Sequence, residues 1–230
     1  MIKNMIKNNK IFKVIKEFTN LQVILLCFKT KYDLTSSLVR MQEFYESDSS
    51  KFRGKYFDLD TYMDWYSKKH DNIFSYFEDW SGFNLPDYSI KEFEKLFKNK
   101  LRVKEEIVLN AINKNLENNN TKYYVIAYQE NDYFTLKHEI SHALFYLNDD
   151  YRNKAINLIS ELPSDIYDGL IKFLKYKKYD SSVFDDEICA YMLSEIDFFQ
   201  NTIKNITKYQ ENFIKLYDTY IKNYGVTYET

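Results

Sequence analysis

Glycine and proline are scarce in this chain, with 4 Gly and 2 Pro among 230 residues. Because these residues are the commonest formers of sharp turns, their scarcity predicts long helices with few sharp connections. Hydrophobic residues make up 45% of the sequence, which is enough for the core of one domain with two lobes or of two small domains. The composition therefore excludes an intrinsically disordered chain.

Cysteine and long apolar runs are also sparse. The two cysteines, Cys27 and Cys189, form neither a C-x-x-C pair nor a disulfide framework, and their apolar surroundings predict buried packing. The longest apolar run, residues 23–28, is too short to cross a membrane and lies too late for a signal peptide. We therefore expect an intracellular, cytoplasmic protein without a transmembrane segment.

The chain has no strong excess of positive or of negative charge. The formal net charge is −2 at pH 7, whereas nucleic-acid binding usually requires a strongly basic surface, so we expect no nucleic-acid partner. Near the start, basic and apolar residues alternate at helical spacing: Lys3, Lys7, Lys10 and Lys13 against Ile2, Met5, Ile6 and Ile15. This spacing predicts an amphipathic helix, which either lies on an anionic membrane surface or exposes its basic face as a docked or frayed terminal helix.

Histidine is scarce too, yet two of the 3 histidines fall in the segment His138-Glu139-Ile140-Ser141-His142. Residues at this spacing lie one above the other on a helix, so both imidazoles can reach a single metal ion. Glu139 is rotated by about 100° from His138, which places its carboxylate beside the ion, where a general base belongs. The uncharged neighbours over residues 136–144, without Gly or Pro, predict that the segment is helical.

This segment resembles the metal-binding helix of the zincin metallopeptidases. The longer motif, uncharged-x-H-E-uncharged-uncharged-H-uncharged-apolar, is met at every position of residues 136–144. The metzincin branch has a Gly and then a third ligand shortly after the second His, where this chain has Phe145 and Asn148, so that branch is excluded. The third histidine, His70, lies in a polar, turn-like segment; we interpret it as a surface residue, with a substrate contact or a metal ligand as the alternatives.

A carboxylate is then required as the third ligand. In the gluzincin branch of the zincins, a Glu on a second helix supplies it within an E-x-x-small pattern, and Glu187-Ile188-Cys189-Ala190 resembles that arrangement. The small Ala190 would let the two helices approach closely. The resemblance thus implies a zinc site of His138, His142 and Glu187. The other acids that remain open as the third ligand are Asp186, Glu195, Asp149 and Asp168.

Two features of the gluzincin pattern are absent from the sequence. Several gluzincins carry an Asp four residues beyond the ligand Glu, which orients a zinc-bound His, whereas this chain has Tyr191 there. A phenol or a main-chain carbonyl would have to take that part. No spare His follows to stabilise an oxyanion, so the available donors are tyrosines: Tyr146, Tyr151, Tyr167 and Tyr191. In a chain with 22 Tyr, each of them is more commonly a packing residue.

The order of apolar and polar segments predicts a mostly helical α+β fold. Strands are expected at residues 21–28 and 122–129, and helices at 60–66, 89–97, 151–162, 164–176, 182–196 and 202–224. A Gly and a Pro predict a loop at 80–86, and an Asn-rich break at 113–120 divides the chain. We expect an N-terminal helical, aromatic-rich lobe over residues 1–120, covering or flanking the cleft, and a zincin-like catalytic lobe over residues 121–230.

The strand expected at residues 122–129 has two interpretations. In zincins a strand just upstream of the metal helix commonly edges the cleft and pairs with the extended substrate backbone, and this segment is placed to do so. It can equally be buried in the small mixed sheet that the zincin resemblance implies above the H-E-x-x-H helix, opposite a helical lower lobe. The two interpretations are compatible.

The resemblance implies a zinc-dependent metallopeptidase that hydrolyses peptide bonds with a metal-activated water. His138, His142 and Glu187 would hold Zn2+ with one open position, and Glu139 would act as the general base. The partner would be a peptide or protein substrate. The alternatives are hydrolysis of another bond, and a non-proteolytic binding or regulatory protein with a structural or vestigial zinc site on the same fold. The oligomeric state cannot be inferred from these patterns.

Overall fold

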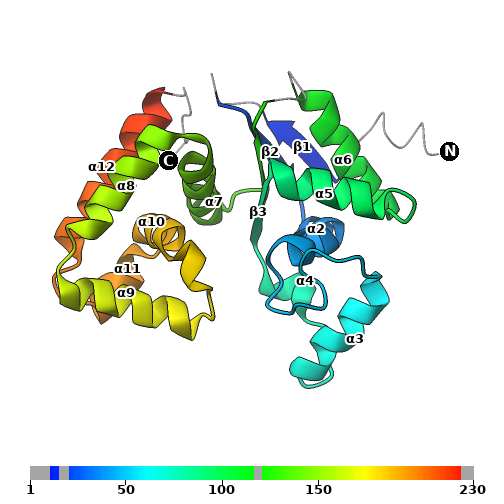
Figure 1. Ribbon diagram of the computed structural model, residues 1–230, viewed down its shortest axis with the longest axis horizontal. Coiled ribbons are helices and arrows are strands. Elements are labelled where there is room, and N and C mark those ends of the chain that lie inside the picture. The colour runs from blue at the N-terminus through cyan, green and yellow to red at the C-terminus, as the bar shows by residue number, and fades with distance from the viewer. Residues whose placement is uncertain (1–10, 16–20, 117–120, 224–230) are drawn as a thin grey trace. The chain divides into compact units, whose positions relative to one another are not determined.

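The computed structural model describes residues 11–15, 21–116 and 121–223 (Figure 1). Contacts divide the chain into two compact units, with the elements β1 to β4 in the first and α7 to α12 in the second. The fold is α+β and mostly helical, as predicted from the sequence.

The first unit combines a small sheet with helices. Its strands are β1 (Phe12–Ile15), β2 (Val23–Phe28), β3 (Gly82–Pro86) and β4 (Tyr124–Gln129). Its helices are α2 (Lys31–Glu46), α3 (Leu59–Lys69), α4 (Tyr76–Asp79), α5 (Asp87–Phe97) and α6 (Val103–Asn115). The strand order is β1-β2-β4-β3, with β2 and β4 parallel and the other two pairs antiparallel. The small mixed sheet predicted from the sequence is therefore present.

Strand β4 lies in the interior of this sheet. It pairs with β2 along one edge and with β3 along the other, and its residues Tyr124 to Tyr128 are buried. Because both edges of the strand are already paired, it cannot also pair with an extended substrate, and the prediction that it edges a cleft is wrong. The alternative, a buried strand in a small mixed sheet, is confirmed. The first unit therefore extends past the Asn-rich break as far as Asp132.

The loop predicted at residues 80–86 is also wrong, because Gly82–Pro86 form β3. This strand is the last in the order β1-β2-β4-β3, and Pro86 is its final residue. Proline is tolerated in an edge strand, where its missing N–H need not remove a bond of the ladder. Pro86 ends the strand, and α5 begins at the next residue, Asp87.

Two further predictions near segment ends need correction. Lys13 and Ile15 belong to β1, so the amphipathic helix predicted for the start does not include them. The other residues of that pattern, Lys3, Lys7, Lys10, Ile2, Met5 and Ile6, lie outside the described residues. At the Asn-rich break, residues 113–115 are the last turn of α6, and residues 117–120 again lie outside the description.

The core of the first unit is built around α2 and aromatic rings. From Leu34 to Phe44 every residue of α2 is buried. Rings from the aromatic-rich stretch pack together beside it: Phe44, Phe52, Phe57, Tyr62, Phe93 and Phe97. We interpret the aromatic residues of this stretch as core formers.

The second unit is helical in all its described elements. These are α7 (Tyr133–Leu147), α8 (Asp149–Ser160), α9 (Ser164–Tyr176), the 3-10 turn η1 (Ser181–Val183), α10 (Phe184–Ser194), α11 (Ile196–Thr202) and α12 (Thr207–Asn223). Helix α7 packs most extensively against α10, and α8 and α12 run side by side (Figure 1). None of the described helices combines the length and apolarity needed to span a bilayer.

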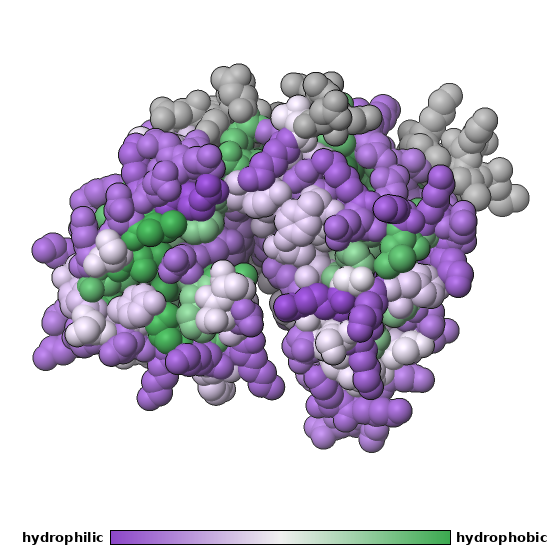
Figure 2. Space-filling view, in the orientation of Figure 1, coloured by the Kyte–Doolittle hydropathy of each residue, from purple (hydrophilic) through white to green (hydrophobic). Residues whose placement is uncertain are grey.

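Helix α7 forms where the apolar spacing predicts it. Leu136, Ile140 and Leu144 are each no more than 4% exposed, so one stripe of the helix is buried as expected. A single residue, Asn148, separates α7 from α8. Its side chain accepts a hydrogen bond from the backbone N–H of Tyr151 at 2.9 Å and so caps the start of α8. Figure 2 shows apolar side chains gathered on this face of the second unit among α8, α9 and α10.

Candidate metal centre

The residues nominated from the sequence come from two helices of the second unit. His138, Glu139 and His142 lie on α7, and Glu187 lies in the first turn of α10. Ala190 is 0% exposed, in keeping with a close approach of the two helices at a small residue. Two segments that are well separated in the sequence are thus brought to one place.

The donor atoms of three residues converge. Nε2 of His138 lies 3.2 Å from Nε2 of His142. The Glu187 carboxylate faces both, with Oε2 at 4.0 Å from Nε2 of His138 and Oε1 at 3.9 Å from Nε2 of His142. One donor atom from each residue fits within 4.8 Å, and all three residues are largely withdrawn from solvent.

This donor set fits a zinc ion. In a tetrahedral site with bonds of about 2.0–2.1 Å, two donor atoms lie about 3.3 Å apart. The two imidazole nitrogens already have this separation at 3.2 Å, and the carboxylate would have to move inward, since one donor atom from each residue now lies within 4.8 Å of the others. Two imidazoles with a carboxylate are also donors that zinc accepts, whereas magnesium and calcium prefer oxygen alone.

The other nitrogen of each imidazole contacts α10. Nδ1 of His142 lies 2.9 Å from Oδ1 of Asp186, and Nδ1 of His138 lies 3.0 Å from Oγ of Ser194. Asp186, which the sequence left open as a third ligand, thus faces the side of His142 that points away from Glu187. Ser194 was missed, although it stands two turns beyond Glu187 on the same helix face, and that spacing was the available signal.

The remaining candidate ligands lie elsewhere. Glu195 is exposed at the end of α10, Asp149 is exposed and pairs with Arg152 in α8 at 2.5 Å, and Asp168 is exposed on α9. His70 belongs to the first unit, where it ends α3 as an exposed residue whose ring stacks on Tyr66 with centroids 4.0 Å apart. The surface interpretation of His70 therefore agrees with its position. Cys189 is buried, as expected from its apolar surroundings.

Charges around the two histidines favour one positive charge between them. Burial lowers the pKa of His138 well below its usual value, and the neighbouring His142 lowers it further. Burial also opposes protonation of His142, but Asp186 and Glu187 outweigh it and raise the pKa of His142 well above the usual value. Glu139, 7% exposed, is close enough to add to this rise. A buried site in which nearby carboxylates outweigh the effect of burial suits a bound cation.

Tyr191 lies against the same site. Its ring meets the His138 ring edge to face at 4.8 Å between centroids, and its hydroxyl is 3.0 Å from that of Tyr179. Burial raises the pKa of Tyr191 to about 12, with Glu187 and Glu139 adding to the effect, so the phenol keeps its proton at neutral pH. Tyr151 is instead buried at 1% exposure, with its hydroxyl 3.4 Å from Oγ of Ser141.

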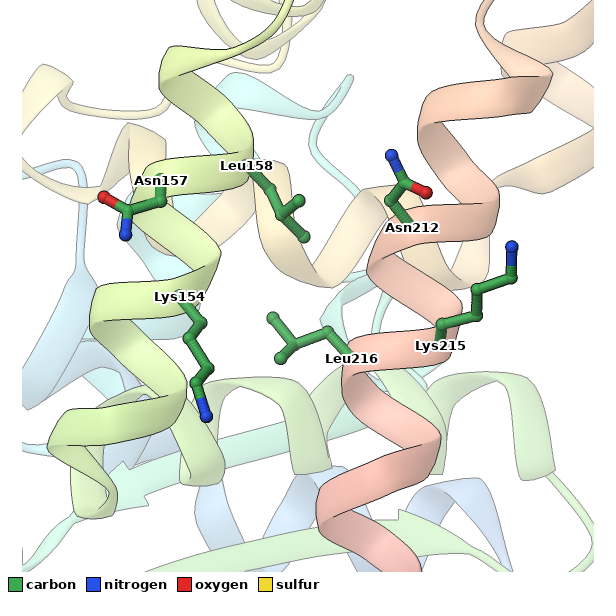
Figure 3. Close-up of a pocket in the computed structure, with 6 residues that line it drawn as sticks. All are labelled: Lys154, Asn157, Leu158, Asn212, Lys215 and Leu216. Atoms are coloured by element: carbon green, nitrogen blue, oxygen red, sulfur yellow. The ribbon is translucent and has the colours of Figure 1, made fainter.

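A groove of about 430 Å³ lies between α8 and α12 of the same unit (Figure 3). Leu158 and Leu216 point toward each other across it, and the lining is completed by Lys154, Asn157, Asn212 and Lys215. These side chains offer methyl groups, amides and ammonium groups, but they are not the donors that zinc prefers. The residues that line the groove therefore do not form a second zinc site like that of His138, His142 and Glu187.

Comparison of the chain with protein-family models, curated proteins and solved structures finds no match.

Proposed function

We propose that this protein is a zinc-dependent metallopeptidase with a gluzincin-type ligand set. The observation that supports the proposal is the convergence of two Nε2 atoms and one carboxylate from α7 and α10, with Glu139 buried beside them. His138, His142 and Glu187 would hold the ion. In the part of the chain that the structure describes, this donor group contains three residues, and three protein ligands with an open position are typical of catalytic zinc.

Zinc bound there would supply Lewis acidity, which lowers the pKa of water and polarises a carbonyl. The chain itself supplies the proton transfers. Glu139 follows His138 directly on α7, so its carboxylate is held beside the ligand set without belonging to it. In the proposed reaction Glu139 takes the proton of the attacking water and passes it to the departing amine.

Tyr191 is the donor that we assign to the oxyanion of the reaction. It stays protonated at neutral pH, because its pKa is raised to about 12, and its ring touches that of the ligand His138. A neutral phenol beside the ion can donate a hydrogen bond to oxygen that becomes negative in the transition state. The contact with Tyr179 would keep the Tyr191 hydroxyl in place before substrate arrives.

The test is cleavage of a peptide library by the zinc-loaded protein and by the Glu139→Gln variant. We expect the parent to cleave peptides and the variant to lose rate by about 10²- to 10⁴-fold while it still binds zinc. Glu161→Gln, at an exposed position that ends α8, is the matched control and should retain full activity. A zinc-loaded Glu139→Gln variant that cleaves at the parental rate would remove Glu139 from the mechanism.

Zinc binding without any peptide cleavage by the parent would contradict the peptidase proposal. It would favour a binding or regulatory protein with a structural zinc site.

A further inference from the structure

The Nδ1 atoms of both histidines have oxygen partners on α10. Oδ1 of Asp186 is 2.9 Å from Nδ1 of His142, and Oγ of Ser194 is 3.0 Å from Nδ1 of His138. Asp186 directly precedes Glu187, and Ser194 lies two turns beyond it on the same helix. Helix α10 therefore contacts each imidazole from the side opposite its Nε2, in addition to presenting the Glu187 carboxylate.

The hydrogen bond of Ser194 has a defined direction. Its hydroxyl donates to the carbonyl oxygen of Ala190 at 3.1 Å, and a carbonyl oxygen can only accept. The single hydrogen of the hydroxyl is thereby used. Both contacts of Ser194 are hydrogen bonds at the same time only when Nδ1 of His138 carries the hydrogen and the Ser194 oxygen accepts it.

The same conclusion holds for His142. An ionised carboxylate only accepts, so a hydrogen on Nδ1 of His142 makes the 2.9 Å approach to Oδ1 of Asp186 attractive and gives this buried oxygen a donor. In a neutral imidazole with hydrogen on Nδ1, the Nε2 atom carries a lone pair. Two such lone pairs would face each other across 3.2 Å and repel, and either a proton shared between them or a metal ion removes the repulsion. A metal ion that also meets the Glu187 carboxylate satisfies all three donors.

We propose that Asp186 and Ser194 are positioning residues, which hold His142 and His138 in the Nδ1–H tautomer and so aim both Nε2 atoms at the ion. This inference rests on the zinc site of the proposed function and deepens it, because neither residue is itself a ligand. Such partners orient the imidazole and increase its basicity, and their loss typically weakens metal binding by about 10- to 100-fold.

The experiment measures zinc affinity at one pH by competition with a chromophoric chelator. Asp186→Asn removes the charge and Ser194→Ala removes the hydroxyl, and we expect each to weaken zinc binding by about 10- to 100-fold. Ser194→Thr keeps a hydroxyl and should restore most of the affinity. Thermal unfolding of each metal-free variant checks that it is folded.

Two matched controls test whether the effect is specific to the histidine contacts. Asp185→Asn makes the same charge change at the exposed preceding position of α10. Ser160→Ala removes a hydroxyl that bonds to a carbonyl in its own helix, that of Asn157 at 2.7 Å. Both controls should bind zinc as the parent does. Parental affinity in folded Asp186→Asn and Ser194→Ala would overturn the proposal.

Cobalt substitution separates a positioning residue from a ligand. At saturating Co2+, the visible bands of Asp186→Asn and Ser194→Ala should keep the parental positions, because the ligand atoms are unchanged, whereas Glu187→Ala should move them. Displaced bands in Asp186→Asn would make Asp186 a ligand and overturn the inference. A folded parent that binds no zinc would overturn both the inference and the proposed function. Zinc affinities as expected, without Glu139-dependent peptide cleavage, would support the positioning roles and contradict only the peptidase.

Discussion

At the scale of single residues, the candidate site depends on the orientation of each side chain near His138 and His142. The Tyr191 ring lies edge to face with His138, and burial raises the pKa of Tyr191 to about 12, with the nearby carboxylates adding to the effect. A tyrosine in this position can be a packing residue or a hydrogen-bond donor. Only the second role needs the hydroxyl oxygen of Tyr191, so a conservative substitution that removes this atom distinguishes the two.

Tyr191→Phe should lower kcat for peptide cleavage by on the order of 100-fold, because an oxyanion would lose a donor. Zinc affinity should stay at the parental value, since the ring is retained. Steady-state kinetics with a cleavable peptide, together with a zinc titration, measure both quantities. The control is Tyr176→Phe on α9, where the side chain is 82% exposed. An unchanged kcat in Tyr191→Phe would return Tyr191 to a packing role.

Glu43 is a buried carboxyl in the first unit, at 7% exposure on α2. Burial raises the pKa of Glu43 above the usual 4.5. The folded chain therefore holds this proton to higher pH than the unfolded chain does. The stability that depends on it is complete below pH 4.5 and is lost as pH rises through the folded-state pKa.

Glu43→Gln should remove this contribution, because the amide does not titrate. The free energy of unfolding of the variant should decrease less than that of the parent as pH rises from 4.5 toward neutrality. Urea unfolding across this range measures the difference. Glu92→Gln, at an exposed position of α5, should follow the parental curve. Parallel curves for Glu43→Gln and the parent would contradict the assignment.

At the scale of elements, a buried ion pair joins α2 to α6. The Arg40 guanidinium donates from Nε to Oε1 of Glu105 at 2.8 Å and from Nη2 to Oε2 at 2.5 Å. Its other hydrogens reach the carbonyl oxygens of Phe57 and Lys100, at 3.0 and 2.9 Å. Both side chains are almost fully buried, at 2% and 0% exposure. The pair is thus satisfied on several sides and fixes the two helices and the segments that precede α3 and α6.

Glu105→Gln should destabilise the protein by about 3–5 kcal/mol, because the Arg40 charge would remain buried without its counter-charge. Denaturant unfolding measures this cost. Glu106→Gln, the same change at the next position of α6, should cost far less. A loss below about 1 kcal/mol in Glu105→Gln would show that water or another group compensates the charge.

The elements differ in how well the sequence predicted them. Helix α9 has the predicted bounds, and β2 and β4 fall inside their predicted ranges, because their apolar patterns reflect local burial. Strand β3 was missed because its Gly and Pro indicate a turn locally, while its pairing with β4 depends on residues far along the chain. In the candidate site, a local motif nominated His138, Glu139 and His142. For Ser194 the only local signal was its spacing from Glu187, because its contact with His138 depends on the packing of α10 against α7.

At the scale of the whole molecule, the two helices that carry the donors come together only in the folded chain. A ligand that binds the folded state alone stabilises it. At a free zinc concentration of 100 times the Kd, the free energy of unfolding should rise by about 2.7 kcal/mol. Magnesium should have no such effect, because it prefers oxygen ligands.

Denaturant unfolding followed by far-UV circular dichroism, with and without zinc, measures this shift. Glu187→Ala should lose most of it, since one of the three donors is removed. An equal shift in the parent and in Glu187→Ala would place the zinc elsewhere in the molecule.

The most direct test of the account is anomalous scattering at the zinc edge from crystals of the zinc-loaded protein. We predict one strong peak about 2.0–2.1 Å from Nε2 of His138 and of His142 and from a carboxylate oxygen of Glu187, with one coordination position left for solvent. No peak between these three side chains would contradict the account. A fourth protein ligand would also contradict it, because the site would then be closed and structural rather than catalytic.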